Sequence, residues 1–247
     1  MPESPRHPSY NRWVLAPIRD PADRAAQLEA IADAVRRCTR CALHRTRTQG
    51  VPGRGPATAR VMAVGEAPGE NEDRQGVPFV GAAGSLLTDL LREIGVPPEE
   101  LFITNVLKSR PPSNRDPLPE EVEACAPYLD AQIDLIRPVV ILLLGRHALQ
   151  RLLPVAPSIS RCHGELLEAH GRHYVPLYHP AAALYNGRLI GTLRADFVRV
   201  RGYLDELTGS AALPAAPAED VLAGGGTASG LGEPATPGAD AEQLGLF

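Results

Sequence analysis

One apolar strand that opens into a long loop constrains this chain more than any other stretch. Residues 61–64 (VMAV) are uniformly apolar, and the run ends abruptly at Gly65. The loop that follows is rich in Gly, Pro and acidic side chains, and a helical pattern begins near Ser85. Open α/β proteins place their ligand sites where strands enter such loops. We therefore expect a ligand site here, although an ordinary strand-to-helix connection with solvated acids explains the same residues.

Further strands and helices alternate along the chain. Apolar runs at residues 101–107 (LFITNVL) and 139–144 (VVILLL) predict buried strands, and residues 159–177 predict a hairpin. Periodic apolar patterns predict helices between them. The order indicates an α/β fold with a mostly parallel sheet whose loops gather at one end. The helices are expected from residues 20–23 to 38, and at about 85–94, 118–136 and 192–207.

Composition divides the chain into four parts. We expect a loose arm at residues 1–23, one folded domain at 24–207, a disordered linker at 208–242 and a docking peptide at 243–247. Residues 208–247 contain five acidic residues and no basic one, which leaves 25 basic and 24 acidic residues in the rest. A nearly neutral body neither requires nor excludes nucleic acid, so local basic loops would have to contact phosphates.

The chain has no 18-residue apolar run, so we expect no membrane span. Its first residues also lack a secretory pattern. Four cysteines without such a signal indicate a reducing, cytoplasmic setting, where metal ligands or buried thiols are more common than disulfides.

Cys38 and Cys41 form a C-x2-C pair after the first predicted helix. This spacing lets two thiolates reach one metal centre, as in zinc and iron–sulfur sites. A redox pair is disfavoured because no thioredoxin-like strand precedes it. Two unrelated buried thiols are the remaining interpretation.

Polar residues follow two of the predicted strands. Asn105 sits in an otherwise apolar strand, and a buried amide needs partners, either in a neighbouring loop or in a ligand. His179 ends another strand, where a histidine is either a structural hydrogen bonder or a group for chemistry. Residues 108–115 (KSRPPSNR) form a basic, proline-stiffened loop suited to phosphate contacts or to a solvated connection.

Five motifs occur in order along the chain: GEAPGE from Gly65, PFVG from Pro78, ITN ending at Asn105, KSRPP from Lys108 and HPA from His179. Together they resemble the family 4 (thermophile-type, iron–sulfur) uracil-DNA glycosylases, over about residues 30–205. The resemblance implies a three-layer α/β sandwich with a mostly parallel central four-stranded sheet, and excision of uracil from DNA by hydrolysis of its N-glycosidic bond.

The resemblance also implies roles for individual residues. Phe79 would stack on the flipped base, Asn105 would distinguish uracil from cytosine, and His179 would donate to uracil O2. Glu66 would stabilise the sugar cation or position water, with backbone N–H groups near Gly65, Glu66 and Ala67 assisting. Because Ala67 occupies the place where related enzymes carry an aspartate, we expect no strong general base. The DNA contacts would come from Lys108, Arg110, Arg115, Leu184 and Tyr185, with Leu184 as a wedge.

A [4Fe–4S] cluster is implied by the same resemblance, on Cys38, Cys41, Cys125 and a fourth cysteine whose place Ser109 takes here. Three options stay open. The Ser109 oxygen ligates the fourth iron, Cys162 or a water substitutes, or the cluster is labile or absent. The expected role of the cluster is structural.

The expected partners are uracil-containing DNA and, for a protein expected to be a monomer, a sliding clamp. The last residues, 243–247 (QLGLF), resemble the bacterial clamp-binding peptide at the end of a flexible tether. Three rival functions remain: a glycosylase for another damaged base such as hypoxanthine, a non-catalytic damage binder, and an iron–sulfur redox sensor.

Overall fold

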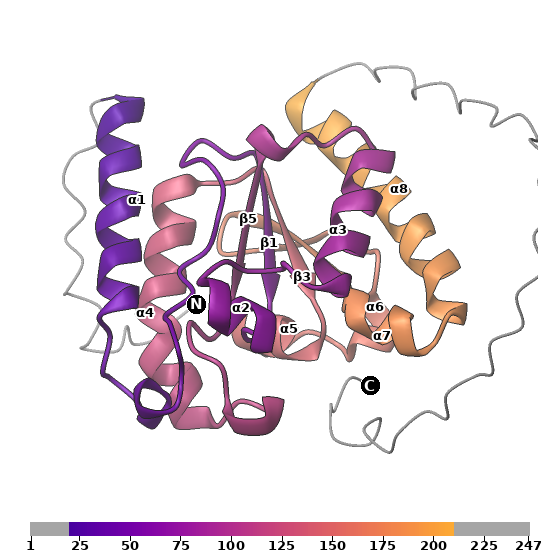
Figure 1. Ribbon diagram of the computed structural model, residues 1–247. Helices are drawn as coiled ribbons and strands as arrows, with labels where there is room; N and C mark the ends of the chain where they lie inside the picture. Colours follow the sequence, from indigo (N-terminus) through magenta and orange to yellow (C-terminus); the bar gives the residue numbers. More distant parts are fainter. Residues whose placement is uncertain (1–19, 210–247) are drawn as a thin grey trace, which may run out of the picture.

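The computed structural model describes residues 20–209 (Figure 1). Most of the predicted arm, the linker and the clamp-binding peptide lie outside the described residues. The first helix begins at Pro21 and the last ends at Thr208, close to the predicted domain limits of 24 and 207. None of the described helices is both long and apolar enough to cross a bilayer.

A single sheet forms the centre of the described part, in the order β2-β1-β3-β5-β4. The first four of these strands pair in parallel, which confirms the predicted parallel sheet. The hairpin predicted for residues 159–177 spans only residues 167–177, because residues 159–162 form a helix, and it adds β4 as a short antiparallel fifth strand at the edge. The strands are β1 (Val61–Gly65), β2 (Leu101–Asn105), β3 (Val140–Leu144), β4 (Leu167–Ala169) and β5 (Arg172–Leu177).

Helices cover both faces of this sheet, so the three-layer arrangement is confirmed (Figure 1). Three helices pack on one face and three on the other, while α1 packs on the outside of α4. One face carries α3 (Ala82–Glu93), α7 (Pro180–Tyr185) and α8 (Arg188–Thr208). The other carries α4 (Pro119–Ile136), α5 (Arg146–Leu152) and α6 (Ile159–Cys162), with α1 (Pro21–Arg36) beyond them.

Alternation along the strands divides the core into two layers. Val61 and Ala63 of β1 face α3 and α8, whereas Met62 and Val64 face α4 and α5. Successive strand residues point to opposite faces, so a strand covered on both sides must be apolar throughout. This explains why β1, β2 and β3 are buried along their whole lengths.

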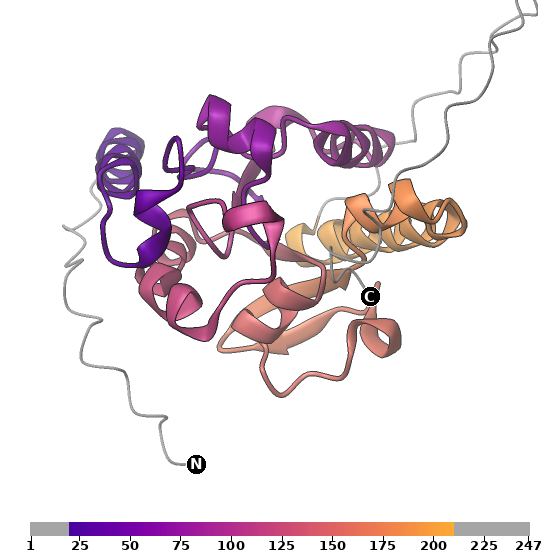
Figure 2. The ribbon, with the colours of Figure 1, turned by 60° about the horizontal axis from the view of Figure 1, so that its bottom comes forward.

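The loops at the carboxyl ends of the parallel strands gather at one end of the sheet, which Figure 2 turns toward the viewer. This end carries α2 (Glu70–Gln75), which the sequence pattern did not predict. Buried Asp73 fixes α2 by accepting hydrogen bonds from the backbone N–H of Thr48, at 2.9 and 3.0 Å. Short 3₁₀ turns complete the connections, at Ala42–Arg45, Pro98–Glu100 and Pro112–Asn114.

Candidate active site

A cavity of about 210 Å³ opens among these loops. Pockets for drug-sized ligands measure about 300–1,000 Å³, so this one suits a single small ring. Its lining comes from the segments after β1, β2 and β5, as expected for a ligand site in an α/β sheet. Predicted site residues among the lining are Glu66, Ala67, Phe79, Asn105, Arg115, His179 and Tyr185.

Asn105 is the last residue of β2, and its side chain is only 2% exposed. Its Oδ1 atom is buried and has no hydrogen-bond partner among residues 20–209. Gly65 lies beside it in the sheet register, and a Cβ there would meet both Asn105 Oδ1 and, at 2.7 Å, the Phe79 ring. The glycine therefore leaves room for the amide and the ring to approach each other. An unpaired buried acceptor at a cavity wall indicates a ligand that donates to it.

Phe79 forms an apolar wall of the cavity and is 7% exposed. Its backbone adopts φ +55°, a region that non-glycine residues rarely occupy. Such strain collects at functional sites, where the surrounding structure holds it in place. The Phe79 ring stacks near His179, with centroids 5.7 Å apart and planes 25° from parallel.

His179 begins the connection from β5 to α7 and lines the same cavity. Burial lowers the pKa of its imidazole to about 4, against a smaller opposing effect of Glu72. The ring is therefore neutral near pH 7. Its Nδ1 accepts a hydrogen bond from the backbone N–H of Ala181 at 3.1 Å, so the single ring proton must be on Nε2. The fold thus prepares a neutral Nε2–H donor at the cavity.

Glu66 is the first residue after β1, and its carboxyl also lines the cavity. Burial and, to a smaller extent, the charge of Asp116 raise its pKa to about 7, while Arg146 acts in the opposite direction. Glu66 therefore changes charge near neutral pH, as groups at functional sites often do.

Glu72 and Asp73 are structural acids. Glu72 Oε1 accepts hydrogen bonds from the backbone N–H groups of Val80 and Gly81, at 3.0 and 3.1 Å. Asp73 holds the segment near Thr48. Together these bonds fix both ends of the loop that carries Phe79.

Lys108 was predicted to contact DNA, and for this residue the prediction is wrong. The side chain is 1% exposed, and its ammonium donates to Thr104 Oγ1, the Asn105 carbonyl and Gln132 Oε1 at 2.5–2.9 Å. Burial lowers its pKa to about 7. With its donors occupied inside the protein, the ammonium cannot reach a surface phosphate.

The two arginines of the basic loop remain closer to the surface. Arg110 donates to Asn114 Oδ1 at 2.8 Å and lies 3.6 Å from exposed Glu70. Arg115 lines the cavity, and its guanidinium binds both oxygens of buried Glu121, at 2.6 and 2.9 Å. The loop is therefore held in shape by ion pairs, with its arginines at the rim.

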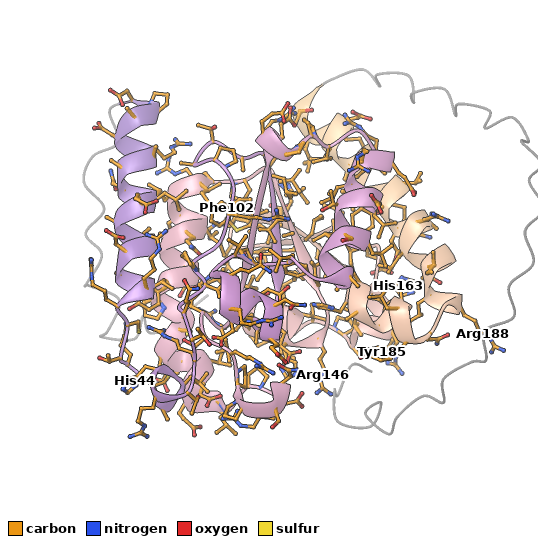
Figure 3. The ribbon with its side chains drawn as sticks, in the orientation of Figure 1. His44, Phe102, Arg146, His163, Tyr185 and Arg188 are labelled. Atoms are coloured by element: carbon orange, nitrogen blue, oxygen red, sulfur yellow. The ribbon has the colours of Figure 1, made fainter. Side chains whose placement is uncertain are left out.

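Leu184 and Tyr185 lie at the end of α7 and are 48% and 61% exposed. Tyr185 also lines the cavity, and Figure 3 shows it at the same end of the molecule as Arg146. Exposed apolar side chains beside a cavity mouth offer a surface for a flat or apolar partner.

Three of the four cysteines gather near the loop that contains Ser109. Cys41 packs with Cys125, whose Sγ accepts from the backbone N–H of Lys108 at 3.4 Å. Arg47 joins Ser109 to this group, because its guanidinium donates to Ser109 Oγ at 2.8 Å and to the Cys38 carbonyl at 2.9 Å.

Cys162 lies apart from this group. It belongs to α6, which lies across the molecule from α1 in Figure 1. Its thiol donates to the carbonyls of Pro157 and Ser158. Cys162 packs in a different apolar cluster from Cys41 and Cys125, so within residues 20–209 the structure gives no support to Cys162 as a substitute ligand.

The sequence interpretation missed a second group behind Glu66. Asp116, Arg146 and His147 lie beside its carboxyl, outside the cavity lining. The sequence did contain a signal for two of these residues. Arg146 and His147 follow β3 after a single glycine, and residues at the carboxyl ends of parallel strands meet at one edge of the sheet.

The chain was also compared with known proteins. The family model described as "Uracil DNA glycosylase superfamily" matches residues 52–203. The type-4 uracil-DNA glycosylase of Sulfurisphaera tokodaii is 47% identical over 186 residues, which cover 70% of this chain and 83% of the relative. The corresponding proteins of Saccharolobus solfataricus and Archaeoglobus fulgidus are 48% and 47% identical, again over 70% of this chain and over 85% and 92% of theirs.

This family match spans the segments that build the cavity, from the loop before β1 to α8. It agrees with the five motifs, which lie at the carboxyl ends of the strands. On these grounds the chain belongs to the uracil DNA glycosylase superfamily.

Proposed function

We propose that this protein is a DNA repair enzyme that flips uracil out of DNA and hydrolyses its N-glycosidic bond. The observation that carries the proposal is the unpaired Oδ1 of Asn105 in a ring-sized cavity beside a neutral His179. The three relatives named above are type-4 uracil-DNA glycosylases, and their names support the same substrate. A base inside a duplex is inaccessible, so the target must leave the stack to enter such a cavity.

Base recognition follows from the amide of Asn105. Uracil N3–H would donate to Oδ1, and uracil O4 would accept from Nδ2. Cytosine presents a donor and an acceptor in the opposite order, so it would leave the amide mismatched. Phe79 would stack on the ring and exclude water from it.

Cleavage breaks the bond between uracil N1 and sugar C1′, and the electron pair leaves with the base. Negative charge develops on uracil O2, and the sugar becomes an oxocarbenium ion. The Nε2–H of His179 would donate to O2, a fixed dipole that needs no proton transfer and no reorganisation. Water then adds to C1′ and releases its proton, which leaves an abasic site.

Glu66 would act on the sugar side of the cavity. Its ionised carboxylate would stabilise the oxocarbenium ion or orient the attacking water. Because its pKa is about 7, this role requires a pH near or above neutrality. The aliphatic Ala67 beside it supplies no second carboxylate, so stabilisation of the leaving group and the cation would dominate.

DNA would approach the rim of the cavity. Arg110 and Arg115 are the candidate phosphate contacts. Exposed Leu184, with Tyr185, would fill the space that the flipped nucleotide leaves in the stack.

The decisive experiment measures single-turnover excision on oligonucleotides with U·G, U·A or single-stranded uracil. Asn105→Asp and His179→Ala should each lower the rate by about 100-fold or more, because each removes a donor aimed at the base. His170→Ala, at an exposed hairpin turn, is the matched histidine control. Full activity in both site variants would overturn the residue assignment.

The same assay separates the rival functions. Preferred excision of hypoxanthine would indicate a different base specificity for the same cavity. Tight binding of uracil-containing DNA without product would indicate a damage binder. If the protein neither binds nor excises uracil-containing DNA, a redox role for the cysteines is the function that remains.

We also propose a [4Fe–4S] cluster held by Cys38, Cys41 and Cys125, with the Ser109 oxygen at the fourth position. The donors fit, because three free thiols and this hydroxyl lie around one loop. Within residues 20–209, these thiols do not form a trio within 4.8 Å. A single zinc with Zn–S bonds of about 2.3 Å needs closer sulfurs, which favours a larger cluster. Bound there, the cluster would join α1 to the loop after β2 and to α4.

Anaerobic purification tests this proposal. The protein should absorb near ~400 nm and contain iron and sulfide. Ser109→Cys should make the absorbance more resistant to air, whereas Cys162→Ser should not change it. Zinc without iron would refute the cluster.

Clamp binding by residues 243–247 also remains a proposal, since this peptide lies outside the described residues. Deletion of these five residues should abolish capture on an immobilised bacterial sliding clamp and leave excision on short oligonucleotides unchanged. Undiminished clamp capture would contradict this proposal.

The predicted cytoplasmic location also stays a proposal, and the proposed DNA substrate supports it.

A further inference from the structure

Three side chains from two other segments lie near the Glu66 carboxyl, outside the cavity lining. Asp116 comes from the loop before α4, and Arg146 and His147 form the first turn of α5. His147 Nε2 lies 3.6 Å from Glu66 Oε2 and 3.4 Å from Asp116 Oδ1. The proposed function uses none of these three residues.

Arg146 organises the group. Its Nη2 lies 2.5 Å from Asp116 Oδ2, and its Nε donates to His147 Nε2 at 3.1 Å. The side chain of Arg146 is 30% exposed, whereas that of His147 is only 15% exposed. One guanidinium therefore orients both groups that lie next to Glu66.

The charges of this group act on Glu66 in opposite directions. Asp116 disfavours a second negative charge, and Arg146 favours it. Burial lowers the pKa of His147, and Arg146 lowers it further, so this imidazole is neutral near pH 7. The other charged or titratable side chains around the cavity are Glu72, Arg115, His179 and Tyr185.

A metal ion is a rival explanation, because ligand atoms of Glu66, Asp116 and His147 lie within 4.8 Å of one another. Arg146 already contacts Asp116 and His147 at hydrogen-bond distance. The protein therefore supplies its own cation at this point, and the geometry favours charge compensation over metal binding.

Building on the proposed function, we propose that Asp116, Arg146 and His147 are positioning residues that hold the Glu66 carboxyl at the cavity and set the pH at which it ionises. The positive charge of Arg146 favours the ionised form of Glu66, and the negative charge of Asp116 partly offsets this effect. His147 fills the space between the two carboxyls, so Glu66 cannot turn away from the cavity. The group touches neither the base nor the sugar in the proposed reaction.

The test is the pH profile of single-turnover uracil excision between pH 5 and 9. Wild type should lose rate on the acid side with a midpoint near pH 7. Asp116→Asn should move this midpoint down and Arg146→Met should move it up, each by about one pH unit. At a pH well below the midpoint, a shift of the midpoint by one pH unit changes the excision rate about tenfold. His147→Ala should lower the high-pH plateau, because Glu66 is no longer held.

An exposed ion pair on α3 provides the matched controls. Asp89→Asn and Arg92→Met remove the same kinds of charge from a pair 2.8 Å apart, and both should leave the midpoint unchanged. Equal midpoints in wild type, Asp116→Asn and Arg146→Met would overturn the inference, as would shifts in the same direction. A midpoint that moves on addition of EDTA or Mn²⁺ would overturn it in favour of a metal site.

A second measurement does not depend on excision. Titration of the Glu66 carboxyl by ¹³C NMR should give the same order of pKa values: Asp116→Asn lowest, wild type between, Arg146→Met highest. If wild type excises no uracil, the proposed function fails while this titration still decides the electrostatic claim. If one variant does not fold, the direction of the other shift decides it.

Discussion

Asn105 and Lys108 lie three residues apart at the carboxyl end of β2, and both side chains are almost fully buried. In the described part of the chain Asn105 Oδ1 has no hydrogen-bond partner, whereas the Lys108 ammonium donates to three oxygens. One of these oxygens is the carbonyl of Asn105 itself. The same short segment thus contains an unpaired polar group at the cavity and a paired one behind it.

This difference separates a ligand-binding residue from a supporting one. A buried polar atom without a partner costs about 1–3 kcal/mol, so its retention at a cavity indicates a ligand that pairs with it. A buried ammonium with three acceptors is complete and offers nothing to a ligand. Lys108 therefore supports the backbone that presents Asn105, although its charge alone suggested a DNA contact.

The largest effect is expected at Asn105. Asn105→Leu keeps much of the side-chain shape but removes both polar atoms, so uracil excision should fall by about 100-fold or more. The free energy of unfolding should stay the same or rise by about 1 kcal/mol, because an unpaired buried oxygen disappears. Single-turnover assays and urea unfolding check the two results. A large loss of stability would show that Asn105 is structural.

Lys108→Met should give the reverse pattern. Three buried oxygens lose their donor, so the free energy of unfolding should fall by about 3 kcal/mol. Excision by the folded protein should change less than tenfold, since Lys108 does not line the cavity. Urea unfolding and excision at low temperature measure these effects. If Lys108→Met stays stable but loses as much activity as Asn105→Leu, Lys108 is not merely a supporting residue and the comparison fails.

Glu66→Gln extends the comparison to a group that titrates. The folded pKa of Glu66, about 7, is above its ordinary value of 4.5, so the folded state binds more protons between these two pH values. The stabilising contribution of Glu66 is therefore complete below pH 4.5 and is lost as pH rises through 7. Wild type should lose about 3 kcal/mol from this group across the window, and Glu66→Gln should not. Urea unfolding at several pH values measures the difference between them, and identical slopes would contradict the shifted pKa.

The smallest effect is expected at the exposed partner of Arg110. Glu70→Gln removes an ion pair 3.6 Å long whose carboxylate is 61% exposed. Such surface pairs contribute at most about 0.5–1 kcal/mol, so the unfolding free energy should change little. Thermal unfolding at low and high salt checks this. A loss as large as that of Lys108→Met would mean that the basic loop depends on its surface charges.

Much of the fold could be predicted because its signals are local. The uniformly apolar runs mark strands buried on both faces, and Asp20 caps α1 through a 2.9 Å hydrogen bond to the Asp23 N–H. Short α2 was missed, because it depends on Asp73 binding the distant segment near Thr48. The antiparallel edge strand followed from the hairpin pattern but was not counted in the sheet.

The candidate site was predicted to a similar extent. Glu66, Phe79, Asn105 and His179 lie around one cavity, as the motifs indicated. The residues behind Glu66 were missed because no spacing in the sequence connects position 116 with positions 146 and 147. Cys162 could not be separated from the other cysteines until α6 was placed.

The sequence by itself determined which segments form strands, where their loops meet and which chemical groups reach the cavity. Period, capping and turn residues are short-range properties, so they can be read from neighbouring positions. Only the tertiary structure decided that Lys108 is internal, that Asn105 Oδ1 is unpaired and that His179 carries its proton on Nε2. These properties depend on burial and on partners that are distant in the chain, and both arise only when the segments pack.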